Sequence, residues 1–404
     1  MTTLSVVIPA YNEEKSIGPI VERVLAVRPA LAQAHVSDLD LIVVDDGCRD
    51  ETASVVRRYP GVRLVQHSTN HGYGAALKTG FSQARGELLG FLDADGTYPP
   101  EYFPALCQAA ADHGADLVVG SRMAGSDSEM PLTRRVGNTF FAALVTLVGN
   151  QRVSDSASGM RVMRRDVLSC LYPLPDGLNF TPVMTTRAIH EQLKIVEVPI
   201  PYSERVGRSK LSVVRDGTRF LQSIVWTAMS YNPARILGAL GFLAVMLAVL
   251  VAMTIPLFGV RGGVHEWPAF RLFVILVLVV GGVNLFSVGT LFNYLVSLFQ
   301  QRPTPPEKQG LFGRPIFRRP LQEQFIWFGL ASLAGGALFC GLALWEGLIL
   351  PPSPLYSFYL LTSGMLILTG LQLILSWLVV LVLRELTRRA GLVEADLRGR
   401  DCAG

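Results

Sequence analysis

The sequence predicts a mostly parallel α/β domain followed by an α-helical membrane domain of four spans. Its charge is unevenly distributed: residues 1–234 carry 23 Lys and Arg against 24 Asp and Glu, but residues 235–404 carry only 13 against 8. Overall 50% of the residues are apolar and 17% are charged, whereas soluble domains carry about 25% charged residues. This composition excludes disordered, collagen-like and disulfide-rich secreted chains. The net charge of +4 comes from the apolar second part and indicates a membrane, not nucleic acid.

In the first part, short β-branched runs alternate with helical patterns such as Ser16–Ala26 and Ala75–Ala84. This alternation predicts a Rossmann-like sheet with helices on both faces. In such sheets ligands bind at the carboxyl ends of the strands. The predicted strands are Leu4–Pro9, Leu41–Asp45, Val62–Gln66, Leu88–Asp93 and Leu117–Gly120.

Polar residues follow three of these strands, and the D-x-D pair Asp93 and Asp95 is the most informative. Two carboxylates on a turn can bind Mg²⁺ or Mn²⁺ and leave coordination positions for phosphate oxygens. A metal that bridges a diphosphate neutralises the charge that develops on a departing nucleotide. The strand ends therefore predict a metal-dependent nucleotide site.

Six motifs, in this order, resemble inverting family 2 glycosyltransferases with the GT-A fold: VVIPAYNEE, VVDDGCRDET, NHGYGAALKTG, FLDADGTYPP, VGSR and SASGMRVMRR. The later EVPIPYSERVGRSK resembles the branch that acts on polyprenyl phosphates, the dolichol-phosphate mannose synthases and their bacterial relatives. The resemblance covers about residues 4–230. It implies transfer of one sugar, glucose or mannose, from a UDP- or GDP-sugar donor to a polyprenyl or dolichyl phosphate.

The resemblance also implies roles for individual residues. The nucleotide-sugar pocket would be formed by Pro9, Tyr11, Glu13, Asp45, Asp46, Lys78 and Asp93, and the metal would be held by Asp93 and Asp95. Relatives often carry Gln two positions after the second Asp, where this chain has Thr97. A hydroxyl is a weaker ligand, so water is the alternative to Thr97 at the third position.

The acceptor phosphate would be met by Arg122 together with Arg134 or Arg135, and from the membrane side by Arg205, Ser209 and Lys210. Cations are needed there because the acceptor and the donor diphosphate are both anions. The expected catalytic set is Asp95, Arg122, Arg205, Lys210 and Asp155. A phosphate acceptor needs no general base, whereas a lipid hydroxyl (diacylglycerol or ceramide) does. Asp155 is the candidate base, and the alternative for it is a loop aspartate that holds backbone N–H groups.

Four charge-free stretches are long enough to cross a bilayer: Ile236–Phe258, Leu272–Phe299, Gln324–Trp345 and Leu355–Leu383. Basic residues concentrate in the connection 300–323 and after Leu383, which predicts that both termini and this loop are cytosolic. The N-terminus lacks the pattern of a signal peptide, so the first domain is expected in the cytosol. The predicted divisions are a GT-A domain at 1–210, an interfacial amphipathic helix at 211–234, spans at 235–384 and a tail at 385–404.

Other classes are less well supported. Processive polysaccharide synthases carry Q-x-x-R-W, but Gln222–Trp226 is QSIVW and lacks the arginine. A transporter usually carries charged residues within its spans, and these four stretches carry no Asp, Glu, Lys or Arg. The five scattered cysteines indicate reduced thiols and no zinc site. The pairs Gly281-Gly282 and Gly335-Gly336 would allow close helix packing, including in a homo-oligomer.

Overall fold

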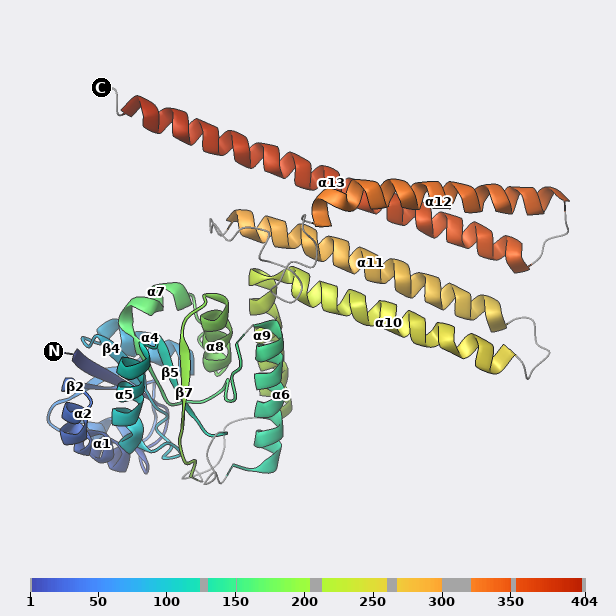
Figure 1. The fold of residues 1–404 in the computed structure, drawn as a ribbon. Helices are drawn as coiled ribbons and strands as arrows, with labels where there is room; N and C mark the ends of the chain where they lie inside the picture. Colours follow the sequence, from blue (N-terminus) through green and yellow to red (C-terminus); the bar gives the residue numbers. More distant parts are fainter. Residues whose placement is uncertain are drawn as a thin grey trace. The chain divides into compact units, whose positions relative to one another are not determined.

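A computed structural model describes residues 2–123, 130–149, 151–203, 213–259, 267–299, 321–349 and 354–401. The chain forms two compact units, Met1–Ala228 and Met229–Gly404 (Figure 1). The first unit is the predicted α/β domain, and the second is entirely helical in its described part.

A seven-stranded sheet with the order β3-β2-β1-β4-β6-β5-β7 forms the centre of the first unit. Its strands are β1 (Thr2–Ala10), β2 (Val36–Asp45), β3 (Val62–Gln66), β4 (Leu88–Phe91), β5 (Leu117–Ser121), β6 (Arg161–Arg164) and β7 (Ile195–Pro199). The five predicted strands are all present, and β6 and β7 are additional. Only β6 runs antiparallel to its neighbours. The amino end of β6 therefore lies at the same edge as the carboxyl ends of the other six strands.

Helices cover both faces of this sheet, as the strand-helix alternation predicted. Alternate side chains of β1 point to opposite faces, so Val6 and Ile8 join one buried cluster and Val7 joins the other. The first cluster is completed by α1 (Ile17–Ala26), α2 (Arg28–Gln33), α3 (Thr52–Val56) and α5 (Phe103–His113). The second is completed by α4 (Tyr73–Gln83), α7 (Leu168–Leu171) and α8 (Phe180–His190). Two short 3-10 helices, η1 (Pro100–Tyr102) and η2 (Arg165–Val167), precede α5 and α7.

Two long helices, α6 (Leu132–Val148) and α9 (Val213–Tyr231), lie side by side in Figure 1. Ile224 of α9 is fully buried in a third cluster with Val145 of α6, and the Phe141 and Phe220 rings are 5.8 Å apart. A helix therefore lies within the residues 211–234 where one was expected, at Val213–Tyr231, and part of its apolar face packs against protein. Its residues Leu221 and Trp226 are exposed.

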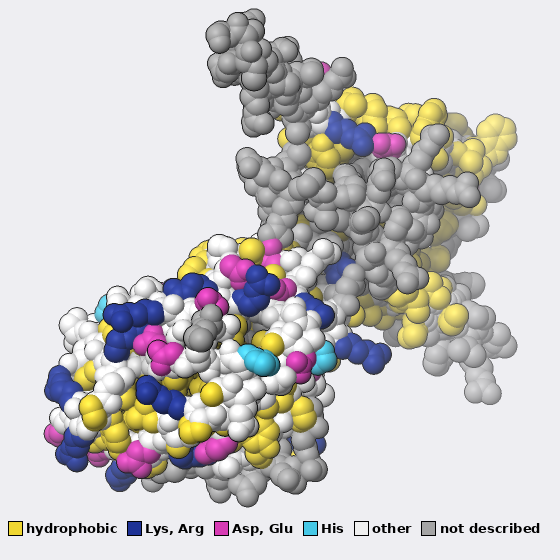
Figure 2. All heavy atoms as spheres, turned by 60° about the vertical axis from the view of Figure 1, so that its left-hand side comes forward, with side chains coloured by type: hydrophobic (Ala, Val, Ile, Leu, Met, Phe, Trp, Pro, Cys, Tyr) yellow, Lys and Arg dark blue, Asp and Glu magenta, His cyan; other side chains and the backbone are white. Residues whose placement is uncertain are grey.

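The second unit contains four long helices: α10 (Pro233–Gly259), α11 (Trp267–Phe299), α12 (Leu321–Ile349) and α13 (Pro354–Asp401). Each includes a segment long and apolar enough to cross a membrane, with mean hydropathy from 1.8 to 2.7. Hydrophobic side chains dominate the described surface of these helices, whereas acidic, basic and polar side chains are mixed over the α/β unit (Figure 2). Helix α13 continues through most of the predicted tail at 385–404.

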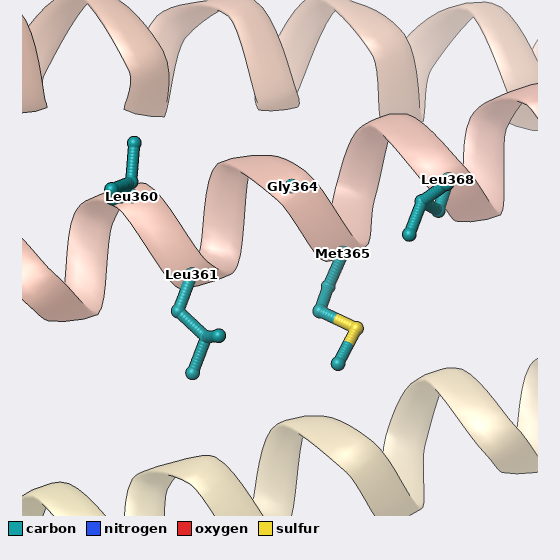
Figure 3. A pocket seen from close by; sticks show the side chains of 5 residues that line it. All are labelled: Leu360, Leu361, Gly364, Met365 and Leu368. Carbon is teal, nitrogen blue, oxygen red and sulfur yellow. The ribbon is translucent and has the colours of Figure 1, made fainter.

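Glycines allow these helices to approach one another closely. A Cβ on Gly282 of α11 would lie 2.7 Å from the carbonyl oxygen of Gly241 of α10. Between α12 and α13, Ser363 Oγ donates to the carbonyl oxygen of Gly336 at 2.8 Å. Gly282 and Gly336 thus serve packing within the chain, so they do not by themselves indicate an oligomer. An apolar hollow of about 360 Å³ on α13 is lined by Leu360, Leu361, Gly364, Met365 and Leu368 (Figure 3). None of these side chains could bind a phosphate.

Candidate active site

The strand register brings the sequence motifs to one edge of the sheet. Ala10 at the end of β1 pairs with Asp45 at the end of β2, and the N–H of Asp46 donates to the carbonyl oxygen of Ala10 at 2.9 Å. On the other side of β1, Val7 pairs with Phe91 of β4, so the D-x-D turn follows next along the edge. Pro9 is buried, and Tyr11 and Glu13 are half-buried in the loop that continues from β1.

The carboxylate of Asp46 is buried and accepts three hydrogen bonds. Its Oδ1 accepts from His67 Nδ1 at 2.7 Å and from the N–H of His71 at 2.9 Å, and its Oδ2 accepts from the N–H of Gly72 at 2.9 Å. Asp45 accepts from the N–H of Cys48 at 2.7 Å and from Gln66 Nε2 at 2.9 Å. These carboxylates hold the loops that flank the expected nucleoside pocket; direct contact with a nucleoside stays a prediction.

Lys78 connects α4 to the loop at residues 172–179. Its ammonium lies 2.6 Å from Asp176 Oδ1 and donates to the carbonyl oxygen of Leu174 at 3.0 Å. The carbonyl oxygen of Asp176 accepts from the N–H groups of Gly74 and Ala75 at the start of α4. A Cβ at Gly74 would lie 2.1 Å from the carbonyl oxygen of Pro175, so this close approach requires glycine. Lys78, which was expected near the donor, thus also holds the loop at residues 172–179 against α4.

The two carboxylates of the D-x-D turn are half-buried and have different partners. Asp93 Oδ1 accepts from the hydroxyl of Tyr73 at 2.7 Å. Burial, reinforced by this carboxylate, raises the pKa of Tyr73 well above its usual range, so the phenol is protonated and donates. Asp95 Oδ1 accepts from Thr97 Oγ1 at 2.6 Å and from the Thr97 N–H at 3.2 Å. The Thr97 hydroxyl therefore orients Asp95, which favours water over Thr97 as the further metal ligand.

The donor chemistry of this turn fits Mg²⁺ or Mn²⁺. Mg²⁺ is usually held by one or two carboxylates and completes its coordination with substrate phosphates and water. Among the residues that the structure describes, no group of three or more His, Cys, Asp or Glu side chains gathers as a cation site. Asp93 and Asp95 would therefore hold the metal together with a diphosphate.

Arg122 and Asp155 form a buried ion pair at the end of β5. Arg122 Nε and Nη2 donate to the two carboxylate oxygens at 2.7 and 2.8 Å, and the Arg122 N–H donates at 3.1 Å. Desolvation alone would raise the pKa of Asp155, but the charge and hydrogen bonds of Arg122 outweigh it and hold this pKa below its ordinary value. Asp155 also accepts from the N–H of Ala157 at 3.2 Å. This geometry favours a loop aspartate that holds backbone N–H groups over a general base.

Aromatic rings join this ion pair to α6. The Arg122 guanidinium lies 5.8 Å from the ring centroid of Tyr98 and 5.5 Å from that of Tyr202. The Tyr202 hydroxyl accepts from Arg134 Nη1 at 3.3 Å. The structure thus brings Arg122 and Arg134 together through Tyr202, whereas Arg135 is exposed. One turn beyond Arg134, the amide of Asn138 is buried and both its nitrogen and oxygen lack a hydrogen-bond partner within the described part of the chain.

A fully buried arginine supports the loop between α6 and β6. Arg161 donates to the carbonyl oxygens of Ser158 and Ser156 and to Thr185 Oγ1, at 2.9 to 3.1 Å. Burial lowers its pKa to about 10, so it is still charged at neutral pH. Glu197 of β7 accepts from the N–H groups of Ser154 and Asp155 and holds the start of the same loop.

Several of these residues were not expected from the sequence, although most lie inside the quoted motifs. They are Tyr73, Tyr98, Asn138, Arg161, Glu197 and Tyr202. The tyrosines next to a glycine or proline in NHGYG, DGTYPP and PIPY were the available signal. The predicted phosphate ligands Arg205, Ser209 and Lys210 lie outside the described residues.

Comparisons with known proteins relate this chain to sugar transferases. Residues 5–172 match the profile of glycosyl transferase family 2, and residues 233–394 match a domain of unknown function. The dolichyl-phosphate hexose transferase of Haloferax volcanii is 31% identical over 222 residues, 55% of this chain and 92% of that protein. The undecaprenyl-phosphate 4-deoxy-4-formamido-L-arabinose transferase of Edwardsiella ictaluri is 28% identical over 305 residues, 73% of this chain and 89% of that protein.

A similar solved structure is the UDP complex of glucosyl-3-phosphoglycerate synthase from Mycobacterium tuberculosis. It is 22% identical, covers 56% of this chain and 80% of that chain, and has a TM-score of 0.46. Other structures of that enzyme contain Mn²⁺ or Mg²⁺. The named relatives above transfer sugars to polyprenyl phosphates, and the family profile covers the strand-end motifs described here. The chain therefore belongs to glycosyl transferase family 2.

Proposed function

We propose that this protein transfers one sugar, glucose or mannose, from a UDP- or GDP-sugar to a polyprenyl phosphate at the cytosolic face of a membrane. The observation that carries the proposal is that carboxylates and arginines lie at the same edge of the sheet. The half-buried carboxylates of the D-x-D turn follow β4, and an arginine network formed by Arg122, Tyr202 and Arg134 lies beyond β5. The carboxylates suit a metal ion bound to a diphosphate, and the arginines suit a lipid phosphate.

On the donor side, the chain positions oxygen ligands. Asp93 and Asp95 would hold the metal with the diphosphate, while Asp45 and Asp46 keep the surrounding loops in place. A bound Mg²⁺ or Mn²⁺ supplies Lewis-acid stabilisation of the negative charge on the departing nucleotide. Direct displacement by the acceptor oxygen then inverts the sugar configuration.

On the acceptor side, the residues favour a phosphate over a hydroxyl. The phosphate oxygen that attacks is already deprotonated near neutral pH, so it needs no base. Asp155 is held ionised by Arg122, and a carboxylate with a depressed pKa is a poor base for a hydroxyl. Arg134 and Arg135 on α6 supply positive charge that offsets the repulsion between acceptor and donor phosphates. Holding both reactants in this way is a large part of the expected rate enhancement.

Exposed apolar side chains support a position at the bilayer surface. On α6, Leu132, Val136, Phe140 and Leu147 form a stripe along one side and are 77%, 68%, 55% and 73% exposed. On α9, Trp226 is 75% exposed. Apolar stripes next to basic residues are typical of helices that lie in the headgroup layer. The amphipathic pattern predicted this role for residues 211–234 alone, and we propose that α6 shares it.

The test uses the purified full-length protein with Mn²⁺, undecaprenyl phosphate and labelled UDP-glucose or GDP-mannose. Lipid-linked product is expected with one donor, and Asp95→Ala should abolish it. Asp112→Ala is the matched control because Asp112 is an exposed carboxylate on α5 that bonds only locally to Gln108. Lack of product with every common nucleotide sugar, or full activity in Asp95→Ala, would contradict the proposal. Product formed on diacylglycerol or ceramide would favour hydroxyl transfer instead.

A further inference from the structure

We propose that Tyr73 is a positioning residue that fixes the Asp93 carboxylate for metal and diphosphate binding, with the backbone of Gly159 packed against the same carboxylate. The inference rests on the proposed function and concerns the same site. It adds two residues that lie far from the D-x-D turn in the sequence and that hold the first of its carboxylates.

The hydrogen bond from Tyr73 is the first observation. Its hydroxyl donates to Asp93 Oδ1 at 2.7 Å. A carboxylate oxygen that accepts this bond cannot rotate freely, so its partner oxygen Oδ2 takes a defined direction. Groups that orient a metal ligand in this way change metal affinity or activity about 10- to 100-fold when removed.

The backbone at Gly159 is the second, independent observation. A Cβ built on Gly159 would lie 2.3 Å from Asp93 Oδ2 and 2.6 Å from its Cγ, far closer than any real contact. The N–H of Gly159 donates to the hydroxyl of the buried Tyr98 at 2.7 Å, which keeps this backbone in place. The carboxylate is therefore hydrogen-bonded by a hydroxyl and lies directly against a bare backbone, where no side chain would fit.

The two carboxylates of the turn consequently depend on different parts of the fold. Asp95 is oriented by Thr97, two residues further along the same turn. Asp93 is oriented by the first residue of α4 and by the loop before β6. The position of α4 is itself fixed by the Asp176 carbonyl oxygen, which accepts from Gly74 and Ala75. Correct placement of Asp93 thus requires three separate chain segments.

The decisive variant is Tyr73→Phe. It removes the hydroxyl and keeps the ring, whose centroid lies 6.4 Å from that of Phe180. The measurement is calorimetric binding of UDP and of GDP to the full-length protein over a Mn²⁺ titration. The half-saturating Mn²⁺ concentration should rise about 10-fold, while the thermal unfolding midpoint stays close to that of the wild type. Tyr59→Phe is the control, because Tyr59 donates to Glu22 at 2.8 Å on the surface.

A second variant tests the backbone at Gly159. Gly159→Ala should raise the half-saturating Mn²⁺ concentration at least as much, whereas Gly217→Ala should not, because a Cβ at Gly217 meets no atom within 4 Å. If Gly159→Ala does not fold, Tyr73→Phe decides alone. Unchanged Mn²⁺ dependence in Tyr73→Phe would overturn the positioning role and leave the proposed function intact. A wild type that neither binds nucleotide with Mn²⁺ nor forms product would overturn both.

Discussion

Asp155 and Asp95 lie at the same edge of one sheet, yet their carboxylates have opposite environments. Asp155 is fully buried, pairs with a guanidinium through both oxygens and receives two backbone N–H groups. Asp95 is half-buried, and its Oδ1 is oriented by the neighbouring Thr97. The fold uses the first carboxylate to hold its own loop and leaves the second near the surface, where an external cation can reach it. Position at a strand end therefore does not by itself distinguish a structural from a ligand-binding carboxylate.

The largest expected effect is on stability at Asp155. Asp155→Ala leaves the buried Arg122 without its partner, and breaking a buried pair from one side costs about 3–5 kcal/mol. The thermal unfolding midpoint of the detergent-solubilised protein should fall strongly, whereas Asp95→Ala should leave it nearly unchanged. Equal unfolding midpoints for the two variants would show that Asp155 contributes no more to stability than Asp95 does.

The second effect is on activity at Asp95, where a substitution should lower the transfer rate and leave stability unchanged. Asp95→Asn should lower the transfer rate about 100-fold, on the order of 2.7 kcal/mol, because a neutral amide is a poor ligand for a hard cation. Its unfolding midpoint should match that of the wild type. Raising the Mn²⁺ concentration should restore part of the rate, and a rate insensitive to Mn²⁺ would indicate that Asp95 acts in another way.

The third effect is a dependence on pH. Because Arg122 holds the folded-state pKa of Asp155 below its ordinary value of 3.8, the ionised carboxylate stabilises the fold. This contribution is fully present above about pH 4 and is lost as the pH falls through the lower folded-state pKa. Unfolding midpoints between pH 5 and pH 2 should therefore fall more steeply in the wild type than in Asp155→Asn. Parallel curves would show that acid acts at other groups.

The smallest effect is expected at an exposed pair. Arg23 and Glu101 form a bidentate contact at 2.8 Å, with side chains 42% and 52% exposed. Exposed pairs contribute about 0.2–1 kcal/mol, so Glu101→Gln should shift the unfolding midpoint by a degree or two at most. A shift as large as that of Asp155→Ala would mean that burial does not explain why the two ion pairs contribute differently to stability.

Local patterns predicted most of the fold. Four of the five predicted strands are hydrophobic runs that are largely buried on both faces, a pattern visible in single segments, and the fifth, β3, is a half-buried edge strand with β-branched residues. Strand β6 was missed because it is four residues long and begins with Arg161, a charged residue whose burial depends on hydrogen bonds to the carbonyl oxygens of the preceding loop and to the distant Thr185. Strand β7 was missed because Glu197 interrupts it, and that glutamate serves the loop before β6.

The candidate site was predicted as a location but not as a set of contacts. The sequence placed Asp45 and Asp46 at one strand end and Asp93 and Asp95 at another, and the register brings both ends to the same sheet edge, on either side of β1. The pairing of Arg122 with Asp155 spans 33 residues and depends on the register of β5 against β6, which no local pattern specifies. For the same reason, the burial of Ile224 against α6 could not be distinguished from burial in lipid.

The reversed direction of β6 also determines which parts of the candidate site one continuous segment of the chain supplies. Because β6 begins at the ligand edge, the chain runs from α6 through the loop at 154–159 directly into this strand. Arg134, Asp155 and Gly159 therefore lie within one continuous segment, residues 131–161, whereas the expected donor residues Pro9 to Asp95 precede it. This one segment therefore reaches both halves of the candidate site, because Arg134 contacts Tyr202 and Gly159 lies against Asp93. Replacing residues 131–161 with those of a relative is expected to alter the arginine network and the D-x-D turn together, and not one of them alone.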